Sequence, residues 1–285
     1  MIDFDKIWVE KYRPTTLDDI ILDERTLKQV KEFKEEIPNL LFVGNPGTGK
    51  TTLARIIVND VLGCNYLYIN ASDESGIDTI RHSITNFAQT KSFDGKVKVV
   101  ILDEADGLTT QAQSALRNTM ETYAKYCRFI LTANYKHKII PALQSRCQAL
   151  DIKPVVELAV KRCYNILKDE KITVPEEQKK KFVQLVKRHF PDLRKTINEL
   201  QKNIIDSELC IVSVTGDNEL LEAVYKKIAS KNSLEARRYL IENEDRFQGD
   251  YDTLLGNYLN FIYTANIEDL KKKEMIAIIA DHLYK

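Results

Sequence analysis

The sequence predicts an α/β protein whose parallel sheet binds a nucleotide and is followed by helical domains. Three observations support this prediction. A glycine-rich loop, residues 44–51, lies between an apolar run and a helix-like segment. A second apolar run, residues 97–102, ends in the acidic stretch 103–106. Strand-like and helix-like segments alternate over residues 38–152, which is typical of a parallel sheet with ligand loops at the carboxyl ends of its strands, whereas helical periodicity dominates after Pro154.

The composition is that of a soluble globular protein with two or three domains, because 44% of its 285 residues are hydrophobic and 29% are charged. It excludes fibrous and disordered classes. The 42 basic residues balance the 42 acidic ones, so any nucleic-acid binding must come from local patches. No signal peptide or membrane span is expected, because no long apolar run occurs. The scattered cysteines predict reduced thiols in the cytoplasm and no zinc site; they are Cys64, Cys127, Cys147, Cys163 and Cys210.

The glycine-rich loop matches the pattern G-x-x-x-x-G-K-[ST]. Its glycines allow successive backbone N–H groups to surround phosphates, its lysine reaches the β- and γ-phosphates, and its threonine hydroxyl ligates Mg²⁺. A fortuitous glycine turn is the alternative, but the strand before the loop and the helix after it argue against that. The predicted nucleotide-binding residues here are Gly44, Asn45, Pro46, Gly47, Thr48, Gly49, Lys50, Thr51 and Thr52.

The acidic stretch supplies the carboxylates that such a loop requires. Asp103 is predicted to hold Mg²⁺ through its waters, and Glu104 to polarise the water that attacks the γ-phosphate. A solvated acidic turn is the alternative reading. Asn134 follows another strand, residues 127–132, and is predicted to fix the attacking water, although it could instead cap the next turn.

The remaining elements follow from periodicity and breaks. The segment 7–14 is predicted to be extended because Pro14 restricts it, and the turn at residues 72–76 is predicted to cap a helix that carries Arg81. The lysine run 179–181 is most simply a solvated helix face. Further strands are expected at residues 40–43, 66–70 and 149–152, and helices at 23–36, 52–57, 110–123, 139–143, 156–168, 176–188, 193–205, 217–229, 233–243, 250–264 and 268–283.

Seven segments occur in the order seen in AAA+ sliding-clamp loaders: residues 9–14, GNPGTGKTT, NASDESGID, VVILDEAD, LTAN, QSRC and PDLRKTIN. The chain resembles replication factor C small subunits over nearly its whole length. It is most similar to the large clamp-loader subunit of T-even-type bacteriophages, on the segments SFDG and PDLRKTI. This resemblance implies an AAA+ P-loop ATPase fold with a nucleotide-binding domain (1–153), a helical lid (154–215) and a C-terminal helical collar for oligomerisation (216–285).

The resemblance also implies roles for residues outside the loop. Arg146 would be an arginine finger that reaches a neighbouring subunit's ATP site, although a surface arginine after a helix is the alternative. Arg194 would be a second sensor on the lid, and Asn134 the polar sensor. Arg81, and more weakly Thr110, would contact DNA. The adenine pocket would consist of Val9, Glu10, Lys11 and Tyr12, with Ile21 nearby.

The expected function is therefore that of an ATPase subunit of a ring-shaped loader, which opens a sliding clamp and places it on primer-template DNA with ATP and Mg²⁺. Its expected partners are the clamp, the DNA, copies of itself and a distinct smaller subunit, in the cytoplasm, or the host cytoplasm if the protein is viral, with no membrane. A branch-migration or unwinding motor is the alternative within the same fold. A small-molecule kinase would not need residues 145–147, a lid and a collar, and Glu104 argues against a binding module that does not hydrolyse ATP.

Overall fold

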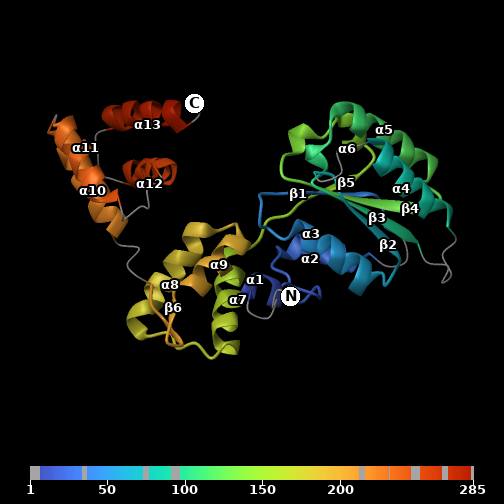
Figure 1. The fold of residues 1–285 in the computed structure, drawn as a ribbon, viewed down its shortest axis with the longest axis horizontal. Coiled ribbons are helices and arrows are strands. Elements are labelled where there is room, and N and C mark those ends of the chain that lie inside the picture. The colour runs from blue at the N-terminus through green and yellow to red at the C-terminus, as the bar shows by residue number, and fades with distance from the viewer. Residues whose placement is uncertain are drawn as a thin grey trace. The chain divides into compact units, whose positions relative to one another are not determined.

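The computed structural model describes residues 7–33, 37–72, 77–90, 97–211, 216–230, 232–244, 251–264 and 269–283. The chain separates into two compact units, residues 1–210 and residues 211–285. Figure 1 shows the elements of both, and each unit is described by itself. None of the helices within the described ranges is long and apolar enough to span a membrane.

The first unit is built on a five-stranded sheet in which every pairing is parallel, as predicted. The strand order is β2-β3-β4-β1-β5. Because β4 lies between β1 and β3, the segments that follow these three strands meet at one edge of the sheet. The strands are β1 Leu40–Val43, β2 Tyr66–Asn70, β3 Lys98–Asp103, β4 Cys127–Ala133 and β5 Gln148–Asp151.

Helices cover both faces of this sheet, and successive strand residues alternate between the two cores. Leu41 and Val100 face a core that includes residues of α4 (Ile77–Gln89) and α5 (Thr110–Thr122). Phe42 and Ile101 face the opposite core, which includes residues of α2 (Glu24–Lys31) and α3 (Lys50–Ile56). In Figure 1, α4, α5 and α6 lie on one side of the sheet and α2 and α3 on the other. The two cores bury the three central strands β1, β3 and β4 almost completely, so these strands hold their carboxyl ends in fixed positions.

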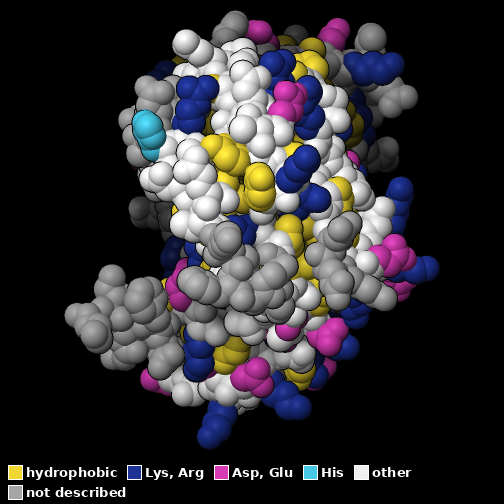
Figure 2. Space-filling model, turned by 90° about the vertical axis from the view of Figure 1, so that its right-hand side faces the viewer, with side chains coloured by type: hydrophobic (Ala, Val, Ile, Leu, Met, Phe, Trp, Pro, Cys, Tyr) yellow, Lys and Arg dark blue, Asp and Glu magenta, His cyan; other side chains and the backbone are white. Residues whose placement is uncertain are grey.

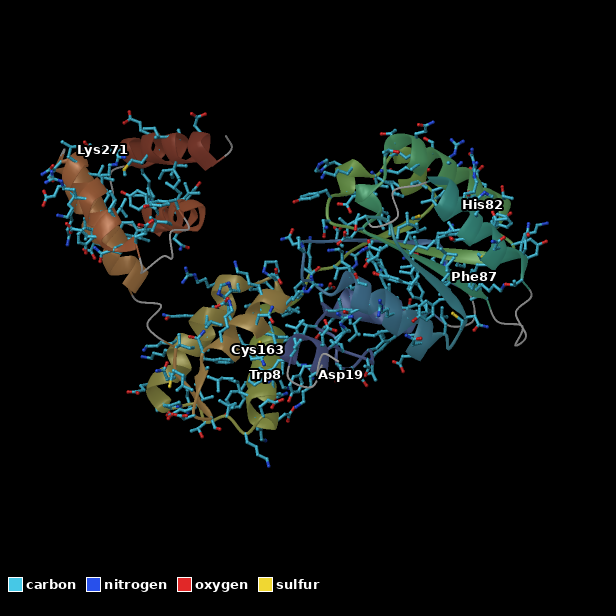
Figure 3. The ribbon with its side chains drawn as sticks, in the orientation of Figure 1. Trp8, Asp19, His82, Phe87, Cys163 and Lys271 are labelled. Carbon is cyan, nitrogen blue, oxygen red and sulfur yellow. The ribbon has the colours of Figure 1, made fainter. Side chains whose placement is uncertain are left out.

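The prediction for the N-terminal segment was wrong: residues 8–11 form a one-turn helix, α1 (Trp8–Lys11), and not an extended chain. Pro14 restricts only the residue before it, which leaves room for one turn upstream. Contacts that are distant in sequence stabilise the turn. The Trp8 side chain is buried, and its backbone N–H donates to Gln201 Oε1 at 3.2 Å. Figure 3 shows Trp8 beside the helices of residues 156–202, close to Cys163.

Several helix boundaries differ from those predicted. The helix predicted at 139–143 is α6 (Pro141–Gln144), because Pro141 takes the first helical position, where no N–H is needed. The helix after the glycine loop starts earlier, at Lys50, and continues from Ile57 to Val61 as a π-helical turn. Asp23 caps α2 by accepting from the Thr26 N–H. Residues 34–36 of the predicted first helix and most of the predicted turn, residues 73–76, lie outside the described residues.

A three-helix bundle and a small hairpin complete the first unit. The helix predicted at 193–205 ends at Lys202 and gives way to the hairpin of β6 (Ile204–Ile205) and β7 (Glu208–Leu209). The two residues in the turn of this hairpin, Asp206 and Ser207, have φ of 50° and 63°. A two-residue type I′ turn requires such positive φ values at both positions. The apolar Ile204–Ile205 pair continued the helical pattern, so periodicity alone missed the strand. The helices are α7 Val156–Asp169, α8 Glu176–His189 and α9 Leu193–Lys202.

The second unit contains four helices within its described residues, in agreement with the four predicted there. Its core forms along α10 and α12 around Leu220, Val224 and Ile262, with Ile279 of α13. The periodicity of apolar residues therefore sufficed to place these helices. They are α10 Gly216–Ala229, α11 Ser233–Glu242, α12 Tyr251–Thr264 and α13 Asp269–Leu283.

Candidate nucleotide site

The glycine-rich loop connects β1 to α3, and its glycines are needed for its shape. Gly47 and Gly49 have φ of 73° and 91°, in the left-handed region that side chains disfavour. At Gly44, a Cβ would lie 2.7 Å from the backbone oxygen of Ile152. This loop therefore wraps tightly before the helix begins, an arrangement that directs backbone N–H groups toward a bound anion.

Lys50 lies at the centre of the site and is buried, with 8% of its surface exposed. Its Nζ donates to Asn134 Oδ1 at 2.7 Å and to the backbone oxygens of Gly44 and Asn45, both at 2.9 Å. Burial lowers the pKa of Lys50, while nearby carboxylates, Asp103 first among them, oppose this shift. The structure thus brings Lys50 and Asn134, which are far apart in sequence, into direct contact.

The carboxylate of Asp103 is also buried, at the end of β3, and it accepts hydrogen bonds from three hydroxyl groups. Thr51 Oγ1 lies 2.7 and 2.9 Å from its two oxygens, Tyr68 OH lies 2.8 Å from Oδ2, and Thr132 Oγ1 lies 2.5 Å from Oδ1. Burial, together with the hydrogen bond to Asp103, raises the pKa of Tyr68 to about 12, which favours the protonated phenol that donates this bond. The sequence predictions named neither Tyr68 nor Thr132. The signals available were that each lies on a strand next to the acidic strand, and that Thr132 is part of the segment LTAN.

This pair of oxygen donors fits a magnesium ion. Mg²⁺ prefers hydroxyl, carboxylate and phosphate oxygens, and the Thr51 hydroxyl lies directly against the Asp103 carboxylate. No group of three or more His, Cys, Asp or Glu side chains that could hold a metal occurs in the described part of the chain. A magnesium ion bound by the Thr51 hydroxyl, and held by Asp103 through water, would take its remaining ligands from nucleotide phosphates and water.

Glu104 and Asp106 follow the strand and differ in their surroundings. Glu104 is exposed toward the cavity, has a left-handed φ of 55°, and donates its N–H to Thr132 Oγ1 at 3.0 Å. Asp106 Oδ2 accepts the backbone N–H groups of Asn134 and Tyr135 at 3.1 and 3.2 Å. Asp106 thus supports the backbone that carries Asn134, while the Glu104 carboxylate remains available to the cavity.

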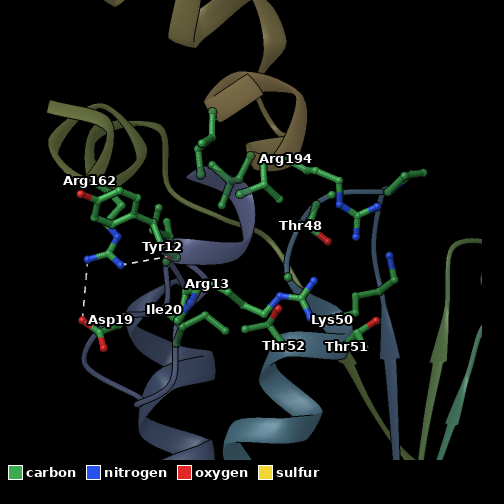
Figure 4. A pocket seen from close by; sticks show the side chains of 18 of the residues that line it. Tyr12, Arg13, Asp19, Ile20, Thr48, Lys50, Thr51, Thr52, Arg162 and Arg194 are labelled. Atoms are coloured by element: carbon green, nitrogen blue, oxygen red, sulfur yellow. Dashed lines mark hydrogen bonds and ion pairs between the residues drawn. The ribbon is translucent and has the colours of Figure 1, made fainter. Parts of the chain in front are cut away.

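A cavity of about 170 Å³ extends from the glycine loop to the N-terminal segment and the helical bundle. Figure 4 shows Lys50 and Thr51 on one side of it, Tyr12 on the other, and Arg194 above, extending over Thr48. Among the residues predicted for the adenine pocket, Val9, Tyr12 and Ile21 line this cavity. Glu10 and Lys11 do not: Glu10 pairs with Arg13, and Lys11 pairs with Glu170. The other lining residues include Arg13, Ile20, Pro46, Gly47, Thr48, Gly49, Thr52, Asp103, Glu104, Thr132, Asn134, Arg162, Cys163, Leu193 and Ile197.

The helical bundle contacts the glycine loop directly. The Leu193 N–H, in the first turn of α9, donates to the Gly47 backbone oxygen at 3.1 Å. The Asp192 carboxylate caps α9 and lies so close to Gly47 that a Cβ there would be 1.9 Å from it. Arg194 follows on the same turn and lines the cavity. The position of α9, and with it Arg194, is therefore linked to the loop that would hold the phosphates.

A second link joins the N-terminal segment to α7. Arg162 donates to the Tyr12 backbone oxygen at 3.3 Å and pairs with Asp19 at 3.7 Å, as the dashed lines in Figure 4 show. Glu170 accepts hydrogen bonds from Lys11 and Tyr12, and these bonds lower its pKa. The segment that lines one wall of the cavity thus depends on the bundle for its conformation.

Three predicted residues lie away from this cavity. Arg146 is exposed just after α6, where its Nε donates to Glu121 Oε1 at 2.6 Å and its Nη1 to the Ala142 backbone oxygen at 2.8 Å. Arg81 is exposed on α4, and Thr110 is exposed at the first position of α5. None of the three contributes to the nucleotide site of its own chain.

Comparison with known proteins places these features in a family. Residues 40–154 match the model of the ATPase family associated with various cellular activities (AAA). Residues 151–209 match the model described as the sliding-clamp-loader large subunit, AAA+ ATPase lid domain.

Curated relatives match nearly the whole chain. The replication factor C small subunit of Archaeoglobus fulgidus is 37% identical, over 95% of this chain and 88% of the relative. Replication factor C subunit 3 of Blastobotrys adeninivorans is 37% identical over 98% of this chain and 80% of the relative. The replication factor C small subunit of Methanococcus vannielii is 41% identical over 79% of this chain and 70% of the relative.

Among solved structures, a variant of RuvB from Thermotoga maritima matches 81% of this chain and 91% of its own, with a TM-score of 0.50 and 19% identity. At that identity the likeness concerns the fold alone. The extent and identity of the replication factor C matches are decisive, and they agree with a parallel sheet that carries a glycine loop and a helical lid. The chain belongs to the replication factor C small-subunit family of AAA+ ATPases.

Proposed function

We propose that this chain is an ATPase subunit of a sliding-clamp loader that uses ATP binding and hydrolysis to open the clamp and load it on primer-template DNA. The observation that supports this most is the convergence of Lys50, Thr51, Asp103, Glu104 and Asn134 at one sheet edge, under a lid whose sequence matches a clamp-loader family. Such a set contains the parts that phosphoryl transfer to water requires.

The phosphate end of the site carries the chemistry. The Lys50 ammonium group would turn from the loop oxygens and Asn134 to the β- and γ-phosphates of ATP. Thr51 and Asp103 would hold Mg²⁺. When bound, the ion supplies positive charge that offsets the charge developing on the phosphates. Because Thr51 and Asp103 are already held together before ATP arrives, these two groups need little reorganisation in the reaction.

Glu104 and Asn134 would act on the attacking water. The Glu104 carboxylate is exposed to the cavity and can polarise a water molecule beside the γ-phosphate. The Asn134 amide, once Lys50 has turned to phosphate, can orient that water or sense the γ-phosphate. Arg194 would contact the γ-phosphate from α9, so that phosphate occupancy changes the angle of the lid.

The adenine would lie at the other end of the cavity, against Val9, Tyr12 and Ile21, with Glu10 and Lys11 on the same helical turn as Val9. The apolar side chains there and the lid residues Cys163 and Ile197 offer a surface of the kind a base needs. We infer the domain bounds 1–153, 154–215 and 216–285. The lid match at residues 151–209 and the separate unit at residues 211–285 support them.

Arg146 would be an arginine finger that acts on the neighbouring subunit. It is exposed, and it lies outside the cavity of its own chain, so it is accessible to another protein. The partners would be copies of this chain, a distinct smaller subunit, and the sliding clamp. We infer a relation to bacteriophage loaders from the segments SFDG and PDLRKTI, and a location in the cytoplasm, which is the host cytoplasm if the protein is viral.

Arg81 and, more weakly, Thr110 would contact DNA phosphates. Both are exposed, on the contacting helices α4 and α5. Figure 2 views the protein from the side on which α4 lies in Figure 1, and Lys and Arg side chains (blue) are exposed over its upper part. A chain without net charge can still bind DNA when several subunits line one channel with a few phosphate contacts each.

Two variants test the proposal. Lys50→Ala should abolish productive ATP binding, whereas Glu104→Gln should bind ATP normally, stop hydrolysis, and still support clamp opening. Nucleotide affinity, steady-state hydrolysis and clamp loading on primed DNA, measured with the assembled loader, distinguish them. Hydrolysis at the wild-type rate by Glu104→Gln would contradict the role of Glu104. An assembly with an active ATPase that neither binds nor loads a clamp would contradict the loader function and leave the ATPase intact.

The motor alternative has less support. The likeness to RuvB shows a shared fold at 19% identity, and the described parts of residues 216–283 are helical and not winged.

A further inference from the structure

We propose that Tyr68 and Thr132 are positioning residues that hold the Asp103 carboxylate in the orientation that magnesium binding needs, and that Thr132 also fixes Glu104. This inference rests on the magnesium role proposed above for Asp103. It assigns a task to two side chains that have no role in the reaction proposed above.

Each oxygen of Asp103 has its own additional hydroxyl partner. Tyr68 OH lies 2.8 Å from Oδ2, and Thr132 Oγ1 lies 2.5 Å from Oδ1. The Thr51 hydroxyl, which would bind the ion directly, is shared between the two oxygens. Two donors from opposite neighbouring strands, β2 and β4, therefore fix the rotation of the carboxylate about its last bond, while Thr51 marks the side on which an ion would bind.

Tyr68 is itself held firmly. It lies on β2 two residues before Asn70, which pairs in register with Asp103, so Tyr68 and Asp103 lie on the same face of the sheet. The Arg55 guanidinium lies over the Tyr68 ring, 4.6 Å from its centroid. Arg55 is one helical turn after Thr51, so α3 places its first turn against Asp103 and its second against the tyrosine that orients Asp103.

Thr132 connects the two acidic residues through one hydroxyl group. It is 1% exposed, donates to Asp103, and accepts the Glu104 N–H at 3.0 Å. Glu104 has a left-handed φ of 55°, which is uncommon for a residue with a side chain. The bond to Thr132 stabilises this conformation, which turns the Glu104 carboxylate away from the strand and toward the cavity.

The expected effect on metal binding is large for such small groups. Removing one partner that orients a metal ligand typically reduces metal affinity by about 10- to 100-fold. We therefore expect Tyr68→Phe, which keeps the ring beneath Arg55, to raise the Mg²⁺ concentration needed for half-maximal ATP affinity by about 10-fold. Nucleotide affinity in EDTA, and turnover at saturating Mg²⁺, should stay within about 2-fold of the wild type.

Thr132→Val should have a second effect that Tyr68→Phe lacks. Besides raising the Mg²⁺ requirement, it should lower turnover by about 10-fold even at saturating Mg²⁺, because Glu104 loses its backbone anchor. Thr132→Ser keeps the hydroxyl group, so its Mg²⁺ requirement and its turnover should both stay close to those of the wild type. Tyr66→Phe is the matched control, because Tyr66 lies on the same strand and face and packs in the core; it should change neither property.

The first experiment measures the affinity of the full chain for ATP at increasing Mg²⁺ concentrations, and once in EDTA, where no free metal is present. The second measures Mn²⁺ binding in the presence of ADP by electron paramagnetic resonance. Asp103→Asn is the reference. If Asp103→Asn leaves the Mg²⁺ dependence unchanged, the metal role of Asp103 fails. If Asp103→Asn shifts that dependence and Tyr68→Phe does not, only the present inference is overturned. If Tyr68→Phe weakens ATP binding equally with and without Mg²⁺, Tyr68 has a merely structural role, and the present inference is also overturned.

Discussion

Replacing Gln113 by leucine should destabilise the turn that precedes Arg146. Gln113 lies on α5 and is 2% exposed. Its Nε2 donates to the backbone oxygens of Leu108 and Lys138 at 3.1 and 2.9 Å, and its Oε1 accepts the Ile140 N–H at 2.8 Å. One side chain thus joins the segment before α5 to the segment before α6.

The magnitude follows from the groups that would lose their partner. Leucine has a similar size but no hydrogen-bonding atoms, so two backbone carbonyls and one backbone N–H would be left unpaired. An unpaired buried polar group costs about 1–3 kcal/mol. Only the bond to Leu108 is fully buried; those to Lys138 and Ile140 are partly buried, so water replaces part of what they lose, and the added apolar side chain offsets a further part. We therefore expect Gln113→Leu to lower the free energy of unfolding of the first unit by about 2–4 kcal/mol, a large share of the 5–15 kcal/mol that is typical.

Urea unfolding followed by far-UV circular dichroism measures this change, and hydrogen exchange at the Ile140 amide localises it. Gln111→Leu is the control, since Gln111 lies on the same helix and is exposed. A loss below about 1 kcal/mol, or one equal to that of Gln111→Leu, would refute the reasoning that Gln113 is a structural connector.

Three further predictions concern the DNA contact, the neighbouring subunit and the lid. Arg81→Ala should weaken DNA binding regardless of sequence and lower the slope of log K against log salt concentration by about one unit. An unchanged slope would show that Arg81 is only a solvated residue on a helix face. Arg146→Ala should bind ATP nearly normally but lose most DNA- and clamp-stimulated hydrolysis, since such fingers contribute about 10³–10⁵ in rate. Mixing Arg146→Ala subunits with Glu104→Gln subunits should recover part of the stimulated hydrolysis. Full activity of Arg146→Ala alone would exclude a finger. Glu170 has a lowered pKa, so its contribution to stability is present above its ordinary pKa of 4.5 and is lost as the pH falls through the lower folded value. The stability gap between wild type and Glu170→Gln should therefore narrow below about pH 4.5 in unfolding experiments, and a gap that stays constant down to pH 2 would contradict this.

The sheet and most helices were predictable because their signals are local. Strand-like runs of four to six residues marked the strands, and helical periodicity marked α7, α8 and the four C-terminal helices. The errors occurred where contacts distant in sequence prevailed. The helix α1 exists because Trp8 packs against the bundle, and the hairpin after α9 exists because a two-residue turn reverses the chain.

The candidate site divides in the same way. A motif identified the loop residues because three closely spaced glycines and a lysine, all within seven residues, determine the geometry of the loop locally. The motifs assigned no role to Tyr68, Thr132 or Glu121, although Thr132 lies within the segment LTAN. Each of the three acts through a partner far away in the sequence: Asp103 for the first two, and Arg146 for Glu121.

The sequence by itself determined which groups could bind phosphate and magnesium, and the order of strands and helices that presents them. Only the tertiary structure decided that Lys50 contacts Asn134, that Asp103 is held by hydroxyls from two neighbouring strands, and that Arg146 lies outside its own site. The physical reason is that local propensity depends on neighbouring residues, whereas hydrogen bonds between β1, β3 and β4 depend on a strand order that parallel crossovers establish only when the whole sheet has formed.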